Sequence, residues 1–226
     1  MQITEIQHES KTKFLDAALH VIRAKGYAAT RVEDVCEAAG LTKGSFFHHF
    51  KSKEDLALAA AKHWSAVTSG AFGSAPYRSL SDPLDRVLAY VDFRKAILRG
   101  ELPDFTCFAG TMVQEVYDTH PLLREACEKS ISDHAAVVEA DIAEAMRTYG
   151  VDAQWTAKSL ALYTQAVLQG AFILAKAKHG PGVAAACIDH LHRYIELLFA
   201  QPKNTIQNVG QNYKEETLWQ HQSKRR

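Results

Sequence analysis

Histidine side chains are the residues of this chain most able to bind a metal ion. The chain has eleven of them; His48 and His49 are adjacent, and His190 and His192 are two residues apart. Neither spacing places two ligands on one face of a helix, where residues three or four apart are neighbours. We therefore expect no metal site.

Carboxylates recur between residues 121 and 150, and paired carboxylates can hold metals or do acid-base catalysis. They are Glu125, Glu128, Asp133, Glu139, Asp141 and Glu144. No Glu-x-x-His pair accompanies them, so a solvated helix face explains them better than a metal site. Gly-x-Ser-x-Gly, phosphate-loop and dinucleotide-binding patterns are missing from the sequence as well. We expect no catalytic residues, no cofactor and no enzymatic activity.

Cysteine chemistry has one interesting candidate. The four cysteines are scattered without a Cys-x-x-Cys pair, which favours free thiols over a zinc site or a disulfide framework. If Asp104 caps a helix, Cys107 lies in its first turn, where the helix dipole stabilises a reactive thiolate. Free cysteine is also among the most buried residue types, and Asp104 disfavours a second negative charge. A sensing thiol and an ordinary core residue therefore both remain open for Cys107.

Composition restricts the classes of protein to which the chain can belong. Its 226 residues are 47% hydrophobic, and 26 basic residues balance 26 acidic ones. A histone-like polycation is excluded, whereas a local basic surface is not. No apolar stretch approaches the roughly 20 residues that span a bilayer, and the polar start lacks a signal-peptide core. We expect a cytoplasmic protein with no membrane partner.

Apolar residues recur three and four apart along most of the chain, which predicts an all-α protein. Short helices are expected over residues 10–25, 30–39 and 42–50, followed by a longer one from residue 52 towards 72. The capping-box pattern Thr30-x-x-Glu33 and the cap residues Thr42 and Ser52 mark three of the helix starts. A loop at 70–83 then separates five more helices, expected at 83–99, from 103, at 121–150, 152–179 and 181–199. Residues 201–226 lack apolar spacing and are predicted to be a mobile tail.

The segment from Thr30 to Leu56 has the pattern of a helix-turn-helix. Two short helices flank Gly40, and the second presents Thr42, Lys43, Ser45, His48 and His49. The free N–H groups at its start and the Lys43 charge favour a DNA phosphate. Gly44 lets the backbone approach DNA, while Phe46 and Phe50 share a face that can pack inward.

The charge of this segment gives only weak support. Residues 1–63 contain nine basic and eight acidic residues, a net of +1. DNA binding must therefore depend on the local placement of Arg31, Lys43, Lys51 and Lys53.

Residues 30–35 (Thr-Arg-Val-Glu-Asp-Val) and 39–56 together resemble the DNA-binding domain of the tetracycline-repressor (TetR) family of bacterial regulators. The likeness covers about the first 65 residues. It implies a three-helix helix-turn-helix domain at 1–65, joined to a larger helical domain at 66–200 that binds a small effector and forms a homodimer. Phe47 stands where the family usually has Tyr, and Cys36 where a small apolar residue is usual. The positions that the resemblance maps onto DNA contacts are Thr30, Thr42, Lys43, Gly44, Ser45, Phe47, His48 and Lys53.

The second domain is much less diagnostic in sequence. Ligand pockets are mostly apolar with a few polar groups, so aromatic and sulfur residues are the candidates there, although most must be ordinary core. The candidate effector-binding residues are Phe93, Phe105, Cys107, Phe108, Met112 and Tyr117.

Two apolar helices near the end of the chain could form a dimer interface. Residues 160–175 are too apolar for an exposed helix, and Gly170 and Ala171 allow a partner helix to approach closely. The next helix carries an apolar face of Ile188, Leu191, Ile195 and Leu198. The alternative is that both helices are buried in the core of a monomer.

The sequence thus predicts a homodimeric, ligand-responsive regulator, a repressor that leaves double-stranded operator DNA when a small-molecule effector binds. The rival hypothesis is a helical small-molecule binding or carrier protein in which DNA binding is vestigial.

Overall fold

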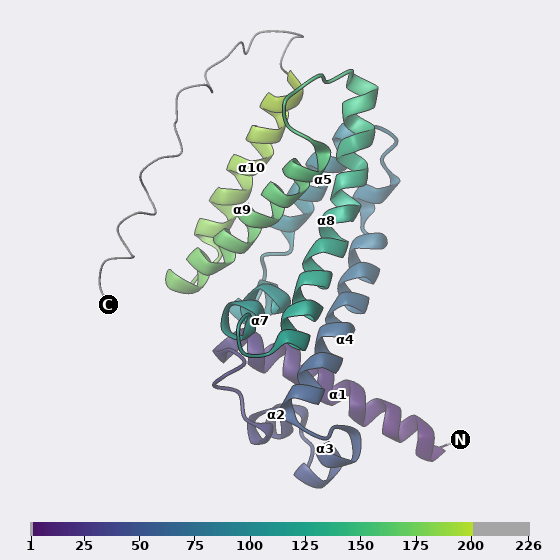
Figure 1. Ribbon diagram of the computed structural model, residues 1–226, viewed down its shortest axis with the longest axis vertical. Coiled ribbons are helices and arrows are strands. Elements are labelled where there is room, and N and C mark those ends of the chain that lie inside the picture. The colour runs from purple at the N-terminus through teal and green to yellow at the C-terminus, as the bar shows by residue number, and fades with distance from the viewer. Residues whose placement is uncertain (1, 201–226) are drawn as a thin grey trace, which may run out of the picture.

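The computed structural model describes residues 2–200, and within this range every regular element is helical (Figure 1). The predicted all-α fold is confirmed, while the predicted tail at 201–226 lies outside the described residues. The helices are α1 (Gln2–Lys25), α2 (Val32–Ala39), α3 (Lys43–His49), α4 (Lys53–Gly73), α5 (Pro83–Ala96), α6 (Leu102–Phe105), α7 (Phe108–Val116), α8 (Pro121–Tyr149), α9 (Ala157–Ala177) and α10 (Gly182–Ala200), with a short 3-10 helix, η1, at Pro76–Ser79.

Local capping chemistry sets the boundaries of the helix-turn-helix. Thr42 caps α3, its Oγ1 accepting the Ser45 N–H at 3.2 Å, and Ser52 caps α4 in the same way. Gly40 ends α2 with a φ of 65°, a left-handed conformation that glycine adopts without strain. These predicted starts and stops are confirmed.

The predicted cap of α2 is wrong by one residue. Arg31 is the N-cap, and its backbone N–H donates to the Asp34 carboxylate at 2.7 Å. Thr30 cannot be the N-cap because its buried hydroxyl donates to the Gly26 carbonyl at 2.6 Å, which closes the preceding turn.

The sequence predicts one helix from Pro103. The structure has two, because the helical hydrogen bonding stops after Phe105 and resumes at Phe108. Thr106 is extended, and both its hydroxyl and its backbone N–H donate to the Leu102 carbonyl, which closes α6. Phe105 and Phe108 then point into different hydrophobic cores, which one continuous helix could not achieve. The expectation of one helix from residue 103 is therefore wrong.

Two cores fill the molecule. The lower core joins α1–α4 to α7 and the start of α8, so Phe14 and Phe46 share it with Phe108 and Met112. The upper core lies among α5, α8, α9 and α10. Figure 1 shows α4 running between the two levels, and the predicted domain boundary at residue 65 falls inside this helix. The domain that contains the helix-turn-helix thus packs on α7 through α1 and α4.

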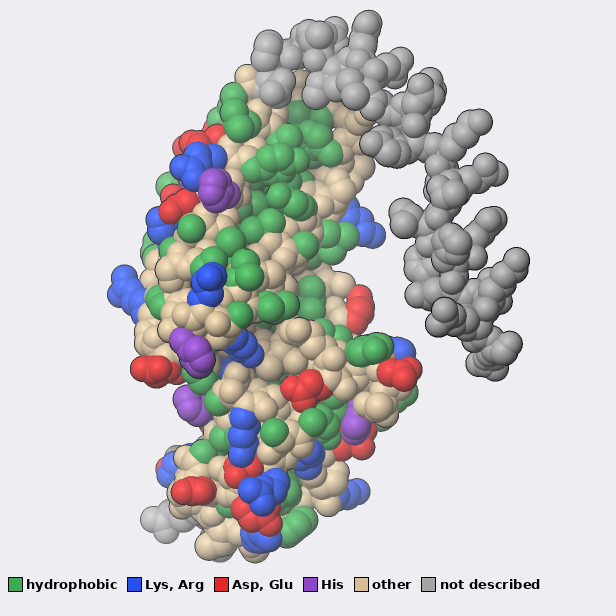
Figure 2. All heavy atoms as spheres, turned by 90° about the vertical axis from the view of Figure 1, so that its left-hand side faces the viewer, with side chains coloured by type: hydrophobic (Ala, Val, Ile, Leu, Met, Phe, Trp, Pro, Cys, Tyr) green, Lys and Arg blue, Asp and Glu red, His purple; other side chains and the backbone are tan. Residues whose placement is uncertain are grey.

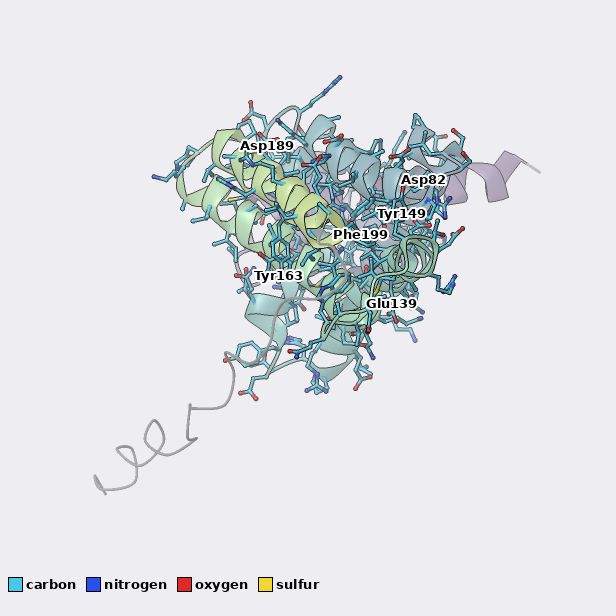
Figure 3. The ribbon with its side chains drawn as sticks, turned by 90° about the horizontal axis from the view of Figure 1, so that it is seen from above. Asp82, Glu139, Tyr149, Tyr163, Asp189 and Phe199 are labelled. Atoms are coloured by element: carbon cyan, nitrogen blue, oxygen red, sulfur yellow. The ribbon has the colours of Figure 1, made fainter. Side chains whose placement is uncertain are left out.

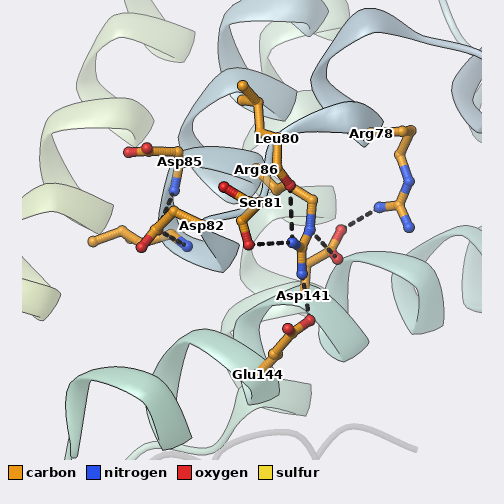
Figure 4. A network of polar contacts seen from close by, with 9 residues as sticks. Arg78, Leu80, Ser81, Asp82, Asp85, Arg86, Asp141 and Glu144 are labelled. Carbon is orange, nitrogen blue, oxygen red and sulfur yellow. Dashed lines mark hydrogen bonds and ion pairs between the residues drawn. The ribbon is translucent and has the colours of Figure 1, made fainter.

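A buried ion cluster ties η1 and α5 to α8 (Figure 4). Asp141 is only 7% exposed and accepts from Arg86 Nε at 3.1 Å and from Arg78. Arg86 also contacts Glu144 and donates to the Leu80 carbonyl at 3.0 Å. The expectation of a fully solvated acidic face on this helix is wrong at Asp141, where two guanidinium groups replace water.

One described helix, α9, is long and apolar enough to cross a membrane, judged by length and composition alone. It packs against α8 and α10 and contributes Leu168, Ala171 and Phe172 to the upper core. Packing within the bundle therefore accounts for one side of this apolar helix.

Candidate DNA-binding surface and ligand pocket

Helix α3 is held by its inner face and presents its outer face to solvent. Phe46 is fully buried, 5.6 Å from the Phe14 ring on α1, and Phe50 closes the same cluster. On the opposite side Phe47 is 59% exposed, and His48 is exposed beside it. This arrangement aims the start and outer side of α3 away from the body.

Lys43 is not free on this surface. Its Nζ forms an ion pair with the exposed Glu33 on α2, and the hydrogen bond from Lys43 holds the pKa of Glu33 below its usual value. A DNA phosphate would therefore have to displace a carboxylate to bind Lys43.

Lys53 is turned inward at the start of α4. Its Nζ donates to the carbonyls of Tyr27 and Thr30, each at 3.1 Å, and lies 4.3 Å from the centre of the Tyr27 ring. These contacts satisfy the ammonium group within the protein and fix the turn between α1 and α2.

His49 joins α3 to α1. Its Nε2 lies 2.7 Å from Ser10 Oγ, and its ring packs against Phe14. Burial, together with His48 and Lys11, lowers the pKa of His49. The sequence placed His49 among the side chains that this helix presents, but the structure uses the side chain inside the domain.

A pocket of about 200 Å³ lies between α4, α5, α6, α8 and α9. Its walls are mainly apolar, with a small group of polar side chains, which is the usual composition of a ligand site. The lining residues are Trp64, Val67, Thr68, Ala71, Phe72, Phe93, Arg94, Ile97, Asp104, Phe105, Thr106, Cys107, Ser130, Ile131, His134, Gln165 and Gln169.

A hydrogen-bonded chain forms one polar side of this pocket. Gln165 Nε2 donates to the Tyr90 hydroxyl oxygen at 3.2 Å, and that hydroxyl lies 2.9 Å from His134 Nε2. Burial, and then the positive charge of Arg94, lower the pKa of His134 to about 3. The neutral ring can therefore accept a hydrogen bond that the Tyr90 hydroxyl donates.

Arg94 supplies the positive charge of the pocket. Its guanidinium carbon lies 5.1 Å from the centre of the Phe72 ring and 5.7 Å from that of Phe172. The Nε atom is buried and has no hydrogen-bond partner among residues 2–200.

Cys107 lies in the wall of the pocket, at the N-cap of α7. Its Sγ accepts the Gly110 N–H at 3.3 Å. A second hollow of about 250 Å³ adjoins the pocket and shares Cys107 and Gln169 with it. The expected first-turn position is thus replaced by a cap position, which still places the sulfur at a helix start.

The pocket wall is attached to α1. Arg23 Nη1 lies 3.4 Å from the carbonyl oxygens of both Asp104 and Thr106, which line the pocket. The same guanidinium lies 5.1 Å from the centre of the Trp64 ring on α4. A displacement of residues 104–107 would therefore reach both α1 and α4.

Helices α9 and α10 leave an apolar surface uncovered. Figure 2 shows hydrophobic side chains gathered over the upper part of one face, and Figure 3 shows Tyr163 on the outer side of the bundle. Tyr163 and Tyr194 are in ring contact across the two helices, with their centres 5.2 Å apart. We call the following exposed residues the α9/α10 face: Leu162, Tyr163, Ile173, Leu174, Tyr194 and Leu197.

Four of the residues predicted to form a dimer interface are buried in the upper core: Ala171, Ile188, Leu191 and Ile195. The other two, Gly170 and Leu198, are half-buried. Both helices are apolar around much of their circumference, so periodicity alone did not distinguish the inner from the outer side.

Comparison with known families decides the assignment. The family model described as "Bacterial regulatory proteins, tetR family" matches residues 14–60, and "Tetracyclin repressor-like, C-terminal domain" matches residues 83–191. Together they cover more than half of the chain. This chain belongs to the tetR family of bacterial regulatory proteins.

Relatives of this tetR-family chain support the assignment. It is 31% identical over 131 residues to the transcriptional regulator CymR of Pseudomonas putida, covering 58% of this chain and 62% of CymR. It is 25% identical over 174 residues to the regulator LmrA of Bacillus subtilis, covering 74% of this chain and 86% of LmrA. A TetR regulator structure from Chloroflexus aurantiacus has a TM-score of 0.75 at 25% identity, covering 85% of this chain and 96% of that one.

The structure divides the DNA contacts that the tetR-family resemblance implies into two groups. Six lie at the surface on or beside α3, and two, Thr30 and Lys53, are engaged inside the turn before α2. The surface group is Thr42, Lys43, Gly44, Ser45, Phe47 and His48. Arg31, predicted to contact DNA through its charge, is exposed at the N-cap of α2.

The candidate effector residues are also divided. Phe93, Phe105 and Cys107 line the pocket. Phe108 and Met112 do not, because both are fully buried in the lower core. Tyr117 is 64% exposed and outside the pocket lining, so these three expectations are corrected.

Sequence reasoning missed the polar side of the pocket. Val87, Tyr90, Val91 and Arg94 follow one helix face, so the spacing of α5 already placed a charged residue on a buried stripe. A charged residue on an otherwise apolar stripe was the sequence feature that could have identified Arg94. His134 carried no comparable signal, since its partner Tyr90 is 44 residues away.

Proposed function

We propose that this regulator is a homodimeric repressor that binds double-stranded operator DNA through α3 and leaves it when a small molecule occupies the pocket. The observation that carries the proposal is the geometry of α3: its inner face is fixed by Phe46, and its exposed start presents Thr42, Lys43 and Gly44. N–H groups at a helix start and an adjacent lysine suit a phosphate, while the outer side chains reach base edges.

The two-fold symmetry of a homodimer would present two such helices. The α9/α10 face supports this arrangement, because an exposed apolar surface of this extent is typical of a protein interface. The operator is then a pseudo-palindrome whose half-sites lie about one helical turn apart, ~34–36 Å, or further.

The contacts of residues 104–107 provide the coupling. A ligand entering the pocket would move this wall, and Arg23 would transmit the movement to α1 and α4. Because Phe108 and Met112 share the lower core with the helix-turn-helix, a shift of α7 would also reorient α3. The ligand must bind the DNA-releasing conformation more tightly for this to occur.

A DNA-binding titration tests the proposal. The full-length protein is titrated against the DNA upstream of its own gene and against unrelated DNA of equal length, at several salt concentrations. We expect preferential binding to the upstream DNA that weakens as salt rises.

A paired substitution provides the control. Lys43→Ala/His48→Ala should abolish specific binding, whereas Lys62→Ala, an exposed lysine of α4, should leave it intact. Equal affinity for both DNAs, or unchanged binding by the double variant, would overturn the proposal and favour a helical carrier protein.

A further inference from the structure

We propose that the pocket binds a small organic monoanion, a carboxylate on a compact apolar body, with the carboxylate held by Arg94. The inference rests on the proposed effector role of the pocket and specifies the class of ligand.

One N–H at the edge of the Arg94 guanidinium, that of Nε, lacks an acceptor, while the same group hydrogen-bonds the Tyr90 hydroxyl. Phe72 and Phe172 contact the cation through their rings, and such contacts satisfy the faces of the planar group. The N–H bonds lie in the plane and need an oxygen there. Nε finds none, and no carboxylate in the described part of the chain forms an ion pair with Arg94.

A carboxylate completes this geometry better than a neutral group. A buried N–H without a partner is costly, and a charge-assisted bond from guanidinium to carboxylate is about twice as strong as a neutral one. The two oxygens of a carboxylate also match the fork of donors that arginine presents.

The other titratable groups of the pocket limit the ligand to one negative charge. His134 is neutral because burial and Arg94 keep its pKa near 3, so it adds no second cation. Asp104 is the acidic residue of the lining, and its carboxylate accepts the Glu101 N–H at 2.8 Å and faces His20 on α1. Arg94 is therefore the basic residue of the lining, and the carboxylate of Asp104 is held by α6 and faces α1.

The remaining walls define the body of the ligand. Phe93, Phe105 and Ile131 also line the pocket and suit an apolar group. The pocket volume of about 200 Å³ lies below the roughly 300–1,000 Å³ of most ligand sites. A space of this size suits a single ring or a short acyl chain.

Matched acids and amides test the proposal on the full-length protein. The probes are benzoate, phenylacetate and hexanoate, each beside its amide, which keeps the shape and removes the charge. We expect at least one acid at ~100 times its Kd to raise the Tm by about 5–10 °C. Its amide should raise the Tm much less.

Variants at Arg94 locate the anion. Arg94→Gln should weaken binding of the stabilising acid about 10–100-fold by calorimetry, and Arg94→Lys should lie between. Arg99→Gln removes an exposed arginine outside the lining and should bind as the wild type does. If Arg94→Gln fails to fold, Arg94→Lys and the acid–amide comparison still decide whether Arg94 holds a carboxylate.

The outcomes separate this inference from the proposed function. Amides that bind as tightly as their acids, unchanged affinity in Arg94→Gln, or no stabilisation by any of the three acids would overturn the inference. Release of the upstream DNA is measured with the same six compounds. An acid that binds through Arg94 without releasing DNA would sustain the inference and contradict the effector role. Release of the DNA by the amides alone would sustain the effector role of the pocket and contradict the inference.

Discussion

The carboxylate of Glu115 on α7 accepts a hydrogen bond from the backbone N–H of Ala28, in the turn that follows α1, at 2.7 Å. Gly26, with a φ of 87°, lies against the same carboxylate, and a Cβ at that position would overlap it. The segment that follows the pocket wall is therefore bonded directly to the DNA-binding part of the chain.

This bond predicts a loss of coupling on substitution. Glu115→Ala should leave operator affinity within a few-fold of the wild type but reduce ligand-induced release, since one of the links between α7 and α1 is removed. Operator titrations with and without a stabilising ligand measure both quantities. Glu125→Ala, an exposed carboxylate on α8, is the matched control. Unchanged release in Glu115→Ala would mean that coupling runs through Arg23 or the lower core instead.

The ion pair between Lys43 and Glu33 predicts opposite effects from its two members. Lys43→Ala should weaken operator binding and lower the salt slope by about one, because a phosphate contact is lost. Glu33→Gln should strengthen binding, because Lys43 is released and a negative charge is removed near DNA. Fluorescence anisotropy at several salt concentrations gives both slopes. Weaker binding by Glu33→Gln would contradict a phosphate role for Lys43.

The α9/α10 face predicts which substitutions dissociate the dimer. Ile173→Asp places a charge in the interface and should raise the dimer dissociation constant at least ~100-fold. Val137→Asp, an equally exposed apolar residue on α8, should not. Ala171→Asp should instead lower the Tm of the protomer, since Ala171 lies in the upper core. Sedimentation and thermal melts distinguish the three, and an intact Ile173→Asp dimer would place the interface elsewhere.

The environments of the cysteines predict an order of alkylation. Cys127 should react last with iodoacetamide, because burial raises the pKa of its thiol to about 12. Cys107 should react first, because its sulfur lies at a helix start beside the pocket. Cys36 is buried and should also lag. Peptide mass spectrometry of partly alkylated protein gives the order, and labelling that begins at Cys187 would contradict it.

A paired DNA-binding assay decides whether Cys107 is a sensor or a pocket wall. We expect Cys107→Ser to keep the cap of α7 and the response to a non-covalent ligand. Loss of DNA binding on alkylation of Cys107, absent in Cys107→Ser, would instead support a sensing thiol.

The depressed pKa of His134 predicts a loss of stability in acid. The folded state keeps His134 neutral down to about pH 3, whereas the unfolded chain binds a proton below about pH 6.5. The free energy of unfolding therefore falls as pH drops through 6.5, by about 1.4 kcal/mol between pH 7.5 and 5.5 from this residue. In His134→Gln the free energy of unfolding should fall less between pH 7.5 and 5.5, because the contribution of His134 is removed. Urea titrations at the two pH values test the difference, and equal declines would show that His134 is accessible to protons.

Much of the helix-turn-helix was predictable because its signals act within a few residues. The caps at Thr42 and Ser52 and the stop at Gly40 depend on hydrogen bonds and a φ value that neighbouring residues set. The same local chemistry carried the family resemblance. The displaced cap at Arg31 shows the limit of these signals, since burial of Thr30 assigned its hydroxyl to another partner.

The pocket and the interface were decided by the tertiary structure. Periodicity shows that a helix has an apolar face, but the partner across the gap decides what that face contacts. Thus Phe105 and Phe108 enter different cores, and Ala171 points inward while Ile173, two residues on, stays exposed. Arg94 and His134 come together from α5 and α8 only when those helices pack. The sequence by itself determined the helices and the family, while packing between distant segments determined where a ligand and a partner subunit can bind.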